Sequence, residues 1–122
     1  MRLKNVLIVV NDIEKSKTFY KELFGLEIVL ENEGNVILTE GLVLQDVTLW
    51  KDFLKKDITP QNNATELYFE EWEIDTFVKK LEEYKEPIQL VTPLMELPGG
   101  QKMLQLYDPD GHLIEVRTPW YV

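Results

Sequence analysis

Cysteine is absent from this 122-residue sequence, so disulfide bonds, thiolate catalysis and cysteine-ligated zinc are excluded. A chain without disulfides fits a reducing compartment, and we predict a cytoplasmic location. Histidine occurs once, as His112. It follows a glycine in a turn, where polar residues are common, so a structural role is its simpler interpretation.

Long hydrophobic runs are also missing. No segment has the ~18 consecutive apolar residues that a membrane span needs, and residues 1–4 lead into a strand without the pattern of a signal peptide. Positive charge is scarce, since 13 Lys and Arg face 22 Asp and Glu, for a net charge of −9. We therefore expect neither nucleic acid nor an anionic membrane as a partner. The acidity is compatible with a neutral or cationic ligand, or serves only to keep the protein in solution.

Turn chemistry and strand-like flanks define one hairpin near the end of the chain. In Asp108-Pro109-Asp110-Gly111, Pro109 presets an early turn position, Asp110 can bond its own backbone and Gly111 accepts positive φ. Apolar runs at 103–107 and 113–116 flank the turn, which predicts two paired strands. Glu115 lies within the second run, where a buried carboxylate needs an ion, a hydrogen bond or a metal.

The sequence contains an internal repeat. Residues 41–45 align with 111–115, and residues 5–14 align with 66–75, each of the latter being a strand that leads into an amphipathic helix. The alignment places four polar residues at equivalent strand positions: Asn5, Gln45, Glu66 and Glu115. We predict an α+β fold of two tandem βαβββ units, with helices outside a curled mixed sheet.

One domain over residues 1–122 is expected, with unit 1 at about 1–57, a linker at about 57–64 and unit 2 at about 65–122. Strands are predicted at 4–10, 26–30, 36–38, 42–45, 66–70, 87–91, 103–107 and 113–116, and helices at 12–24, 48–56 and 73–84. Strand 4–10 is predicted to be central because residues 6–10 are apolar on both faces. Strand 66–70, its equivalent in the second unit, is predicted to be central as well. Leu49 and Phe53 are expected to point inward, and residues 92–100 to form a loop.

Strand alternation assigns side chains to faces. Leu104, Leu106, Ile114 and Val116 should lie under the second helix. The opposite face mixes polar, aromatic and aliphatic side chains, which suits a ligand site. Its predicted residues are Asn5, Leu7, Val43, Gln45, Glu66, Tyr68, Met103, Gln105, Tyr107, Leu113, Glu115 and Arg117. Arg117 shares a face with Glu115 and is expected to pair with it or with Glu66. Trp50, Trp72 and Trp120, with the two tyrosines, could add an aromatic lining or belong to the core or a dimer contact.

The chain resembles the vicinal oxygen chelate superfamily, which contains glyoxalase I, extradiol dioxygenases, fosfomycin-resistance enzymes and bleomycin-resistance proteins. The resemblance covers nearly the whole chain and is carried by residues 11–26, by 66–77 and most strongly by 99–115. It implies two paired βαβββ units around a cleft. In metal-dependent members four side chains from the first and last strands bind a divalent ion, and the matching positions are Asn5, Gln45, Glu66 and Glu115.

Active members usually carry histidine at one or both of the places of Asn5 and Glu66, and only Glu115 is a customary ligand. The four oxygen donors suit Mg²⁺, Ca²⁺ or Mn²⁺ better than zinc. We therefore expect a metal-independent protein that binds a small molecule, similar in type to the bleomycin-resistance group, without a cofactor. A metal-dependent lyase or isomerase of the glyoxalase type and a non-catalytic protein-interaction member are the alternatives. A homodimer is expected, with Trp120, Tyr121 and the helix around Trp50 and Phe53 supplying apolar surface.

Overall fold

The computed structural model describes residues 1–120 and divides the chain into two compact units, Met1–Pro60 and Gln61–Val122. The division falls inside the segment that the sequence predicts as a linker. Each unit has its own four-stranded sheet, and each is described by itself. Within the described residues, no helix is long and apolar enough to cross a bilayer.

Unit 1 begins with strand β1 (Val6–Val10) and helix α1 (Ile13–Phe24). Strands β2 (Ile28–Asn32) and β3 (Asn35–Leu38) follow, then a 3-10 turn η1 (Thr39–Gly41), strand β4 (Leu42–Asp46) and helix α2 (Val47–Leu54). The sheet order is β1-β4-β3-β2, in which β1 runs parallel to β4 and the other pairs are antiparallel.

Unit 2 repeats this plan. It contains strand β5 (Glu66–Glu70), helix α3 (Ile74–Glu83), and strands β6 (Leu90–Glu96), β7 (Lys102–Tyr107) and β8 (Leu113–Arg117). The order is β5-β8-β7-β6, with β5 parallel to β8. The predicted α+β fold of two tandem βαβββ units is therefore confirmed, with a mixed sheet in each unit.

Local sequence explains where α1 begins and ends. The Asp12 carboxylate accepts a hydrogen bond of 3.1 Å from the Lys15 backbone N–H, which satisfies one of the free donors of the first turn. Gly25 ends the helix with φ of 69°, a left-handed conformation that glycine adopts without strain. Helix 12–24 was predicted from the same two residues.

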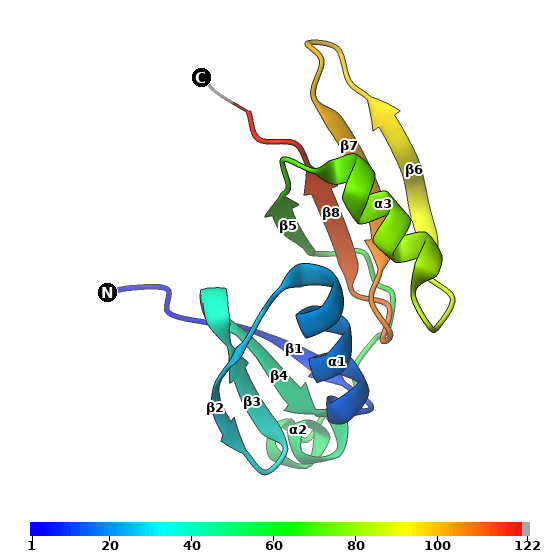
Figure 1. Cartoon of the computed structure of the whole chain (residues 1–122). Helices are drawn as coiled ribbons and strands as arrows, with labels where there is room; N and C mark the ends of the chain where they lie inside the picture. Colours follow the sequence, from blue (N-terminus) through cyan, green and yellow to red (C-terminus); the bar gives the residue numbers. More distant parts are fainter. Residues whose placement is uncertain (121–122) are drawn as a thin grey trace. The chain divides into compact units, whose positions relative to one another are not determined.

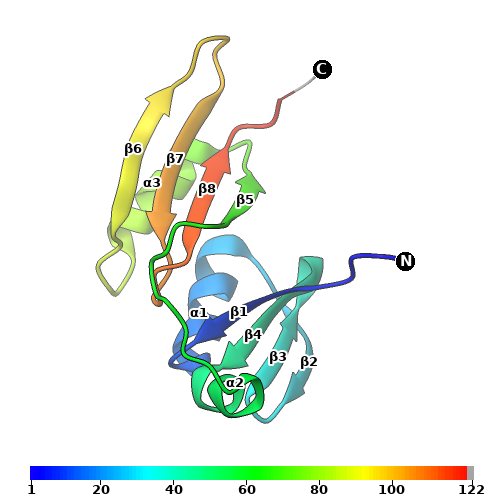
Figure 2. The same ribbon diagram turned by 180° about the vertical axis from the view of Figure 1, so that it is seen from behind.

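The core of unit 2 lies between α3 and one face of its sheet. Leu104, Leu106, Ile114 and Val116 are all buried beneath the helix, as alternation predicts. Figure 1 shows α3 crossing the sheet, and the reverse view shows the opposite sheet face in front of the helix (Figure 2). Among the described residues of unit 2, no helix covers that opposite face, which we call the open face.

Strands β1 and β5 lie at the ends of their sheets, so their predicted central position is wrong. Val6 is 49% exposed and Leu7 is 37% exposed, although both belong to the most apolar strand of the chain. The apolar composition of a strand indicates how well its side chains can pack. Its position in the sheet depends instead on which strands it hydrogen-bonds with.

The β6 region also differs from the prediction. Residues 87–89 lie outside the strand, and 92–96 belong to it instead of to a loop. Pro93 suggested a loop because proline cannot donate a backbone hydrogen bond. It is tolerated because β6 is an edge strand, whose pairing with β7 shifts register between Leu90 and Met95.

Helix α2 forms where it was predicted but does not bury the expected side chains. Leu49 is 47% exposed and Phe53 is 83% exposed. The Asp46 carboxylate caps the helix by accepting from the Leu49 backbone N–H at 3.1 Å. The capping residue therefore sets where the helix begins, while the apolar side chains Leu49 and Phe53 remain largely exposed.

Candidate functional site

The turn between β7 and β8 is held by a buried carboxylate. The Asp108 Oδ1 atom accepts from the backbone N–H groups of Asp110, at 2.8 Å, and His112, at 2.9 Å. The sequence predicts turn chemistry of this kind at Asp110, and the structure shows that Asp108 also supplies it. Gly111 adopts φ of 83°, as its place in the turn requires. The turn fixes the register in which β8 presents Glu115.

Strand pairing places the eight predicted unit 2 residues on the open face. Glu115 pairs in register with Gln105 on one side and with Tyr68 on the other. The neighbouring pairs on the same face are Met103 with Arg117, Tyr107 with Leu113, Glu66 with Leu113 and Glu70 with Arg117. The face therefore combines carboxylates, one guanidinium, two tyrosines and apolar side chains.

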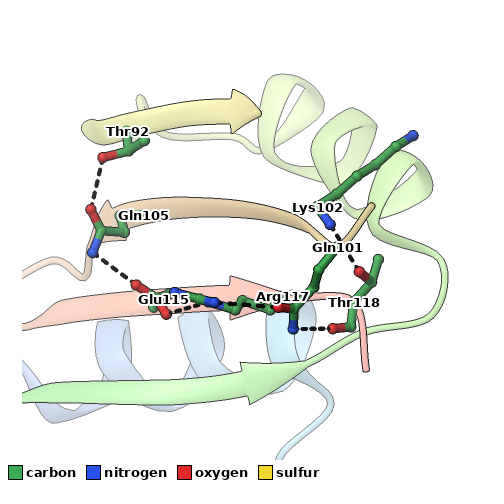
Figure 3. A network of polar contacts seen from close by, with 7 residues as sticks. All are labelled: Thr92, Gln101, Lys102, Gln105, Glu115, Arg117 and Thr118. Atoms are coloured by element: carbon green, nitrogen blue, oxygen red, sulfur yellow. Dashed lines mark hydrogen bonds and ion pairs between the residues drawn. The ribbon is translucent and has the colours of Figure 1, made fainter. Parts of the chain in front are cut away.

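Glu115 is 5% exposed, and both of its carboxylate oxygens have partners. Gln105 Nε2 donates to Oε1 at 3.0 Å, and Arg117 Nε donates to Oε2 at 2.7 Å (Figure 3). The predicted pairing of Arg117 with Glu115 is confirmed. An ion pair with a second hydrogen bond makes a carboxylate tolerable at this depth, because neither oxygen is left desolvated without a partner.

The network continues on both sides of Glu115 (Figure 3). Thr92 Oγ1 donates to Gln105 Oε1 at 2.7 Å, and Arg117 Nη1 donates to Gln101 Oε1 at 3.3 Å. Gln101 Nε2 in turn donates to the Thr118 carbonyl at 2.7 Å. Sequence analysis did not identify Thr92, Gln101 or Thr118 as site residues. Thr92 lay in the predicted loop 92–100, Gln101 between that loop and the strand predicted at 103–107, and Thr118 beyond the strand predicted at 113–116.

Strand β5 carries the carboxylates of the open face that form no ion pair among the described residues. Glu66 and Glu70 are exposed, with Tyr68 between them at 50% exposure. No ion pair to either carboxylate is found within the described residues. The Arg117 guanidinium carbon lies 5.9 Å from the centroid of the Tyr68 ring, within the range of a cation–π contact. Arg117 is therefore committed to Glu115, Gln101 and Tyr68.

Unit 1 shows a neutral version of the central pair. Gln45 stands opposite Asn35 as Glu115 stands opposite Gln105, and Asn35 Nδ2 donates to Gln45 Oε1 at 2.7 Å. Leu7 and Val43 are paired on the same sheet face as Gln45. Asn5 is exposed and lies just before β1.

The parallel ladders of the two units differ in register by two residues. In unit 2, Glu66 pairs with Leu113. The unit 1 equivalent of Leu113 is Val43, which pairs with Leu7 instead of with Asn5. Counted from the helices, however, Asn5 and Glu66 are equivalent, since α1 begins at Ile13 and α3 at Ile74. The parallel pairing of β1 with β4 is therefore shifted by two residues relative to β5 with β8. Faces are preserved because side chains alternate with a period of two.

The aromatic residues are dispersed. Trp72 and Trp120 are exposed, and Trp50 is half-buried on α2. The Tyr107 hydroxyl donates to Asn63 Oδ1 at 2.6 Å, which ties the start of unit 2 to the end of β7. Of the five, only Tyr68 and Tyr107 belong to the open face, and Tyr121 lies outside the described residues.

Two of the four side chains at the metal positions that the resemblance implies, Gln45 and Glu115, already bind other side chains within their own unit. The Glu115 oxygens bind Arg117 and Gln105, the Gln45 oxygen binds Asn35, and the Arg117 cation sits 2.7 Å from Glu115. Within residues 1–120, no three His, Cys, Asp or Glu side chains are grouped in a way that could hold a metal.

Comparison with known proteins places the chain in a family. A model of the family described as "Glyoxalase-like domain" matches residues 3–120. The chain belongs to this family. It is thereby a member of the vicinal oxygen chelate superfamily that its motifs indicate.

Curated relatives and solved structures match over nearly the whole chain. A metallothiol transferase FosB from Lysinibacillus sphaericus is 24% identical over 95% of this chain and 81% of its own. A fosfomycin resistance protein FosX from Listeria monocytogenes is 23% identical over 95% and 88%. A protein of unknown function from Agrobacterium tumefaciens has a TM-score of 0.83 and is 28% identical, with coverage of 98% and 95%.

Proposed function

We propose that this glyoxalase-like protein binds a small neutral or cationic molecule on the open face of unit 2 without metal catalysis. The observation that carries the proposal is the β5 stripe of Glu66, Tyr68 and Glu70, which is exposed beside the paired Glu115–Arg117 centre. A bound amine would compensate Glu66 and Glu70, for which the described part of the chain supplies no ion pair. Tyr68 and Tyr107 offer ring surface to an apolar body.

The charge of the face opposes anionic ligands. Three carboxylates, Glu66, Glu70 and Glu115, share it with a single guanidinium, and that guanidinium already binds Glu115 at 2.7 Å. A phosphate or carboxylate ligand would meet like charge without a free cationic partner. The chain as a whole carries −9, which adds to this preference.

Calorimetry with a matched arylalkyl amine and arylalkyl carboxylate tests the proposal. The amine should bind more tightly to the wild type, and Glu66→Gln with Glu70→Gln should weaken it up to about fivefold per carboxylate, as exposed ion pairs allow. Glu83→Gln removes the same charge from the end of α3 and serves as the control, with unchanged affinity expected. Tighter carboxylate binding, or an unchanged affinity in the double variant, would contradict the proposal.

A metal-dependent lyase or isomerase is the second candidate, because relatives named metallothiol transferase share 24% and 27% identity with this chain. For the binding proposal, Zn²⁺ or Ni²⁺ should neither raise the melting temperature by several degrees nor support turnover of a hemithioacetal. Mg²⁺ and Mn²⁺ belong in the same screen, because oxygen donors suit hard ions. A stoichiometric ion retained through purification, together with turnover, would favour the second candidate.

A further inference from the structure

A cavity lies on the helix side of the sheet in unit 2, opposite the open face. It occupies about 330 Å³ between α3 and β6, within unit 2. We call it the α3–β6 pocket. Its floor includes Leu104, which is buried under the helix, whereas the residues discussed above for ligand binding face the opposite way. The two sites are therefore separated by the sheet itself.

The walls of the pocket are aliphatic. Val78 and Leu81 contribute from α3, three positions apart on one helix face, and Leu90 and Leu94 contribute from β6. Leu90 is 50% exposed, so apolar surface faces solvent at the rim. A volume of about 330 Å³ lies near the lower end of the ~300–1,000 Å³ range of small-molecule pockets.

Unit 1 provides an internal comparison, since α1 stands against the edge strand β2 as α3 stands against β6. The fifth residue of α1 is Lys17, which forms ion pairs with Glu31 of β2 and with Glu14. The hydrogen bonds that Lys17 Nζ donates to these carboxylates, that to Glu31 first, raise the pKa of Lys17 above its ordinary 10.5. The fifth residue of α3 is Val78, which cannot make such a bridge.

The ninth helix position reverses charge between the units. Lys21 of α1 lies 3.8 Å from Glu27, whereas α3 has Glu82 at this position. Unit 1 also packs Phe19, Tyr20 and Phe24 in mutual ring contact, with centroids 5.0 to 5.7 Å apart. The residues at matching distances from the start of α3 are Lys80 and Leu81, within the helix, and Lys85, two residues beyond its end, and none of the three is aromatic.

The rim of the pocket carries net negative charge. Glu82 and Glu86 both line it, and Lys85 lies 6.0 Å from the ring centroid of Tyr84, another lining residue. Two carboxylates therefore line a largely aliphatic cavity, and the exposed Lys85 lies near the ring of the lining residue Tyr84. Such a combination favours a molecule with an apolar body and a cationic end.

We propose that the α3–β6 pocket is a second ligand site, which takes a compact hydrophobic amine. The apolar body lies between Val78, Leu81 and Leu94, and the ammonium lies at Glu82 and Glu86. This role is independent of the open face, because no residue of the pocket belongs to that face.

Methyl NMR of the whole chain, titrated with n-octylammonium, n-octanol and octanoate, tests the site. Octylammonium should shift the methyl signals of Val78, Leu81, Leu90 and Leu94 and bind about fivefold more tightly than octanoate, as an exposed ion pair allows. Glu82→Gln with Glu86→Gln should remove that preference. Leu94→Trp fills the cavity and should lower the affinity at least about tenfold.

Matched variants separate this site from the open face. Glu83→Gln and the Glu66→Gln, Glu70→Gln pair should leave octylammonium binding unchanged. Val78→Lys introduces into α3 the residue type of Lys17, its equivalent in α1, and should also abolish binding. It provides a second test if Leu94→Trp does not fold. The proposal is overturned if these methyl signals do not shift, if octanoate binds equally well, or if only the open-face variants weaken binding.

Discussion

Glu115 is the residue on which the open face depends. Its side chain is 7% exposed and receives hydrogen bonds from Arg117 and Gln105, so truncation removes a desolvated charge together with its partners. We expect Glu115→Ala to lower the free energy of unfolding by about 1.5–3 kcal/mol, the range for hydrogen bonds to charged groups. Urea denaturation measures this change.

A double-mutant cycle isolates the Glu115–Arg117 interaction. The Arg117 side chain is 30% exposed, so solvent screens part of it, and we expect a coupling energy of about 1 kcal/mol. The control is the Lys21–Glu27 pair, whose side chains are 65% and 63% exposed and which should couple by less than about 0.5 kcal/mol. Equal couplings in the two cycles would mean that burial adds nothing at Glu115.

Gly41 is a second residue whose identity the backbone demands. It adopts φ of 79°, and a Cβ atom would lie 2.8 Å from the Lys4 carbonyl oxygen. Gly25 has φ of 69° with nothing within 4 Å of such an atom. Gly25→Ala should cost about 1–2 kcal/mol from the left-handed conformation alone. Gly41→Ala should cost at least about 1 kcal/mol more, because backbone must move. Equal costs by chemical denaturation would show that the backbone before β1 moves away from the added Cβ atom without cost.

At the scale of elements, one lysine joins a helix to an edge strand. Lys17 of α1 pairs with Glu31 of β2, and its pKa is raised by that contact. A raised folded-state pKa means that the stabilisation is complete below about pH 10 and is lost as the pH rises through the folded value. The stability difference between wild type and Lys17→Met should therefore be constant near neutral pH and shrink above pH ~10.5.

Lys79→Met is the matched control for that measurement, because Lys79 is exposed on α3. Its difference from wild type should stay constant over the same alkaline range. Thermal denaturation followed by circular dichroism at several pH values gives both curves. A Lys17→Met difference that grows with pH would reverse the sign of the linkage and rule out the proposed ion pair.

At the scale of the whole molecule, exposed apolar side chains point to self-association. Phe53 is 83% exposed and Leu49 is 47% exposed on α2, and Trp120 is 54% exposed near the chain end. We predict a homodimer in which such surface is covered. Light scattering should give twice the chain mass of 14.4 kDa at micromolar concentration, and Phe53→Ser should shift the equilibrium towards monomer. A monomeric wild type would refute the prediction.

Sequence alone determined those features that depend on neighbouring residues. Asp12 and Gly25 bound α1 because capping and left-handed φ are local requirements. Gly111 and the alternation of 103–107 and 113–116 fixed the last hairpin and the faces of its strands. The repeat and the βαβββ order followed from the same local signals applied twice.

Tertiary structure decided what depends on pairing between distant segments. Only the ladders show β1 and β5 at sheet ends, β6 continuing through Pro93, and a two-residue shift between the parallel pairs. Only the fold shows that Gln101, 16 residues from Arg117, completes the Glu115 network, and that Val78 opens a pocket where Lys17 makes an ion pair. Strand register and cavities arise from contacts between elements. The hydrophobic period of a strand predicts only which face of the sheet each side chain takes.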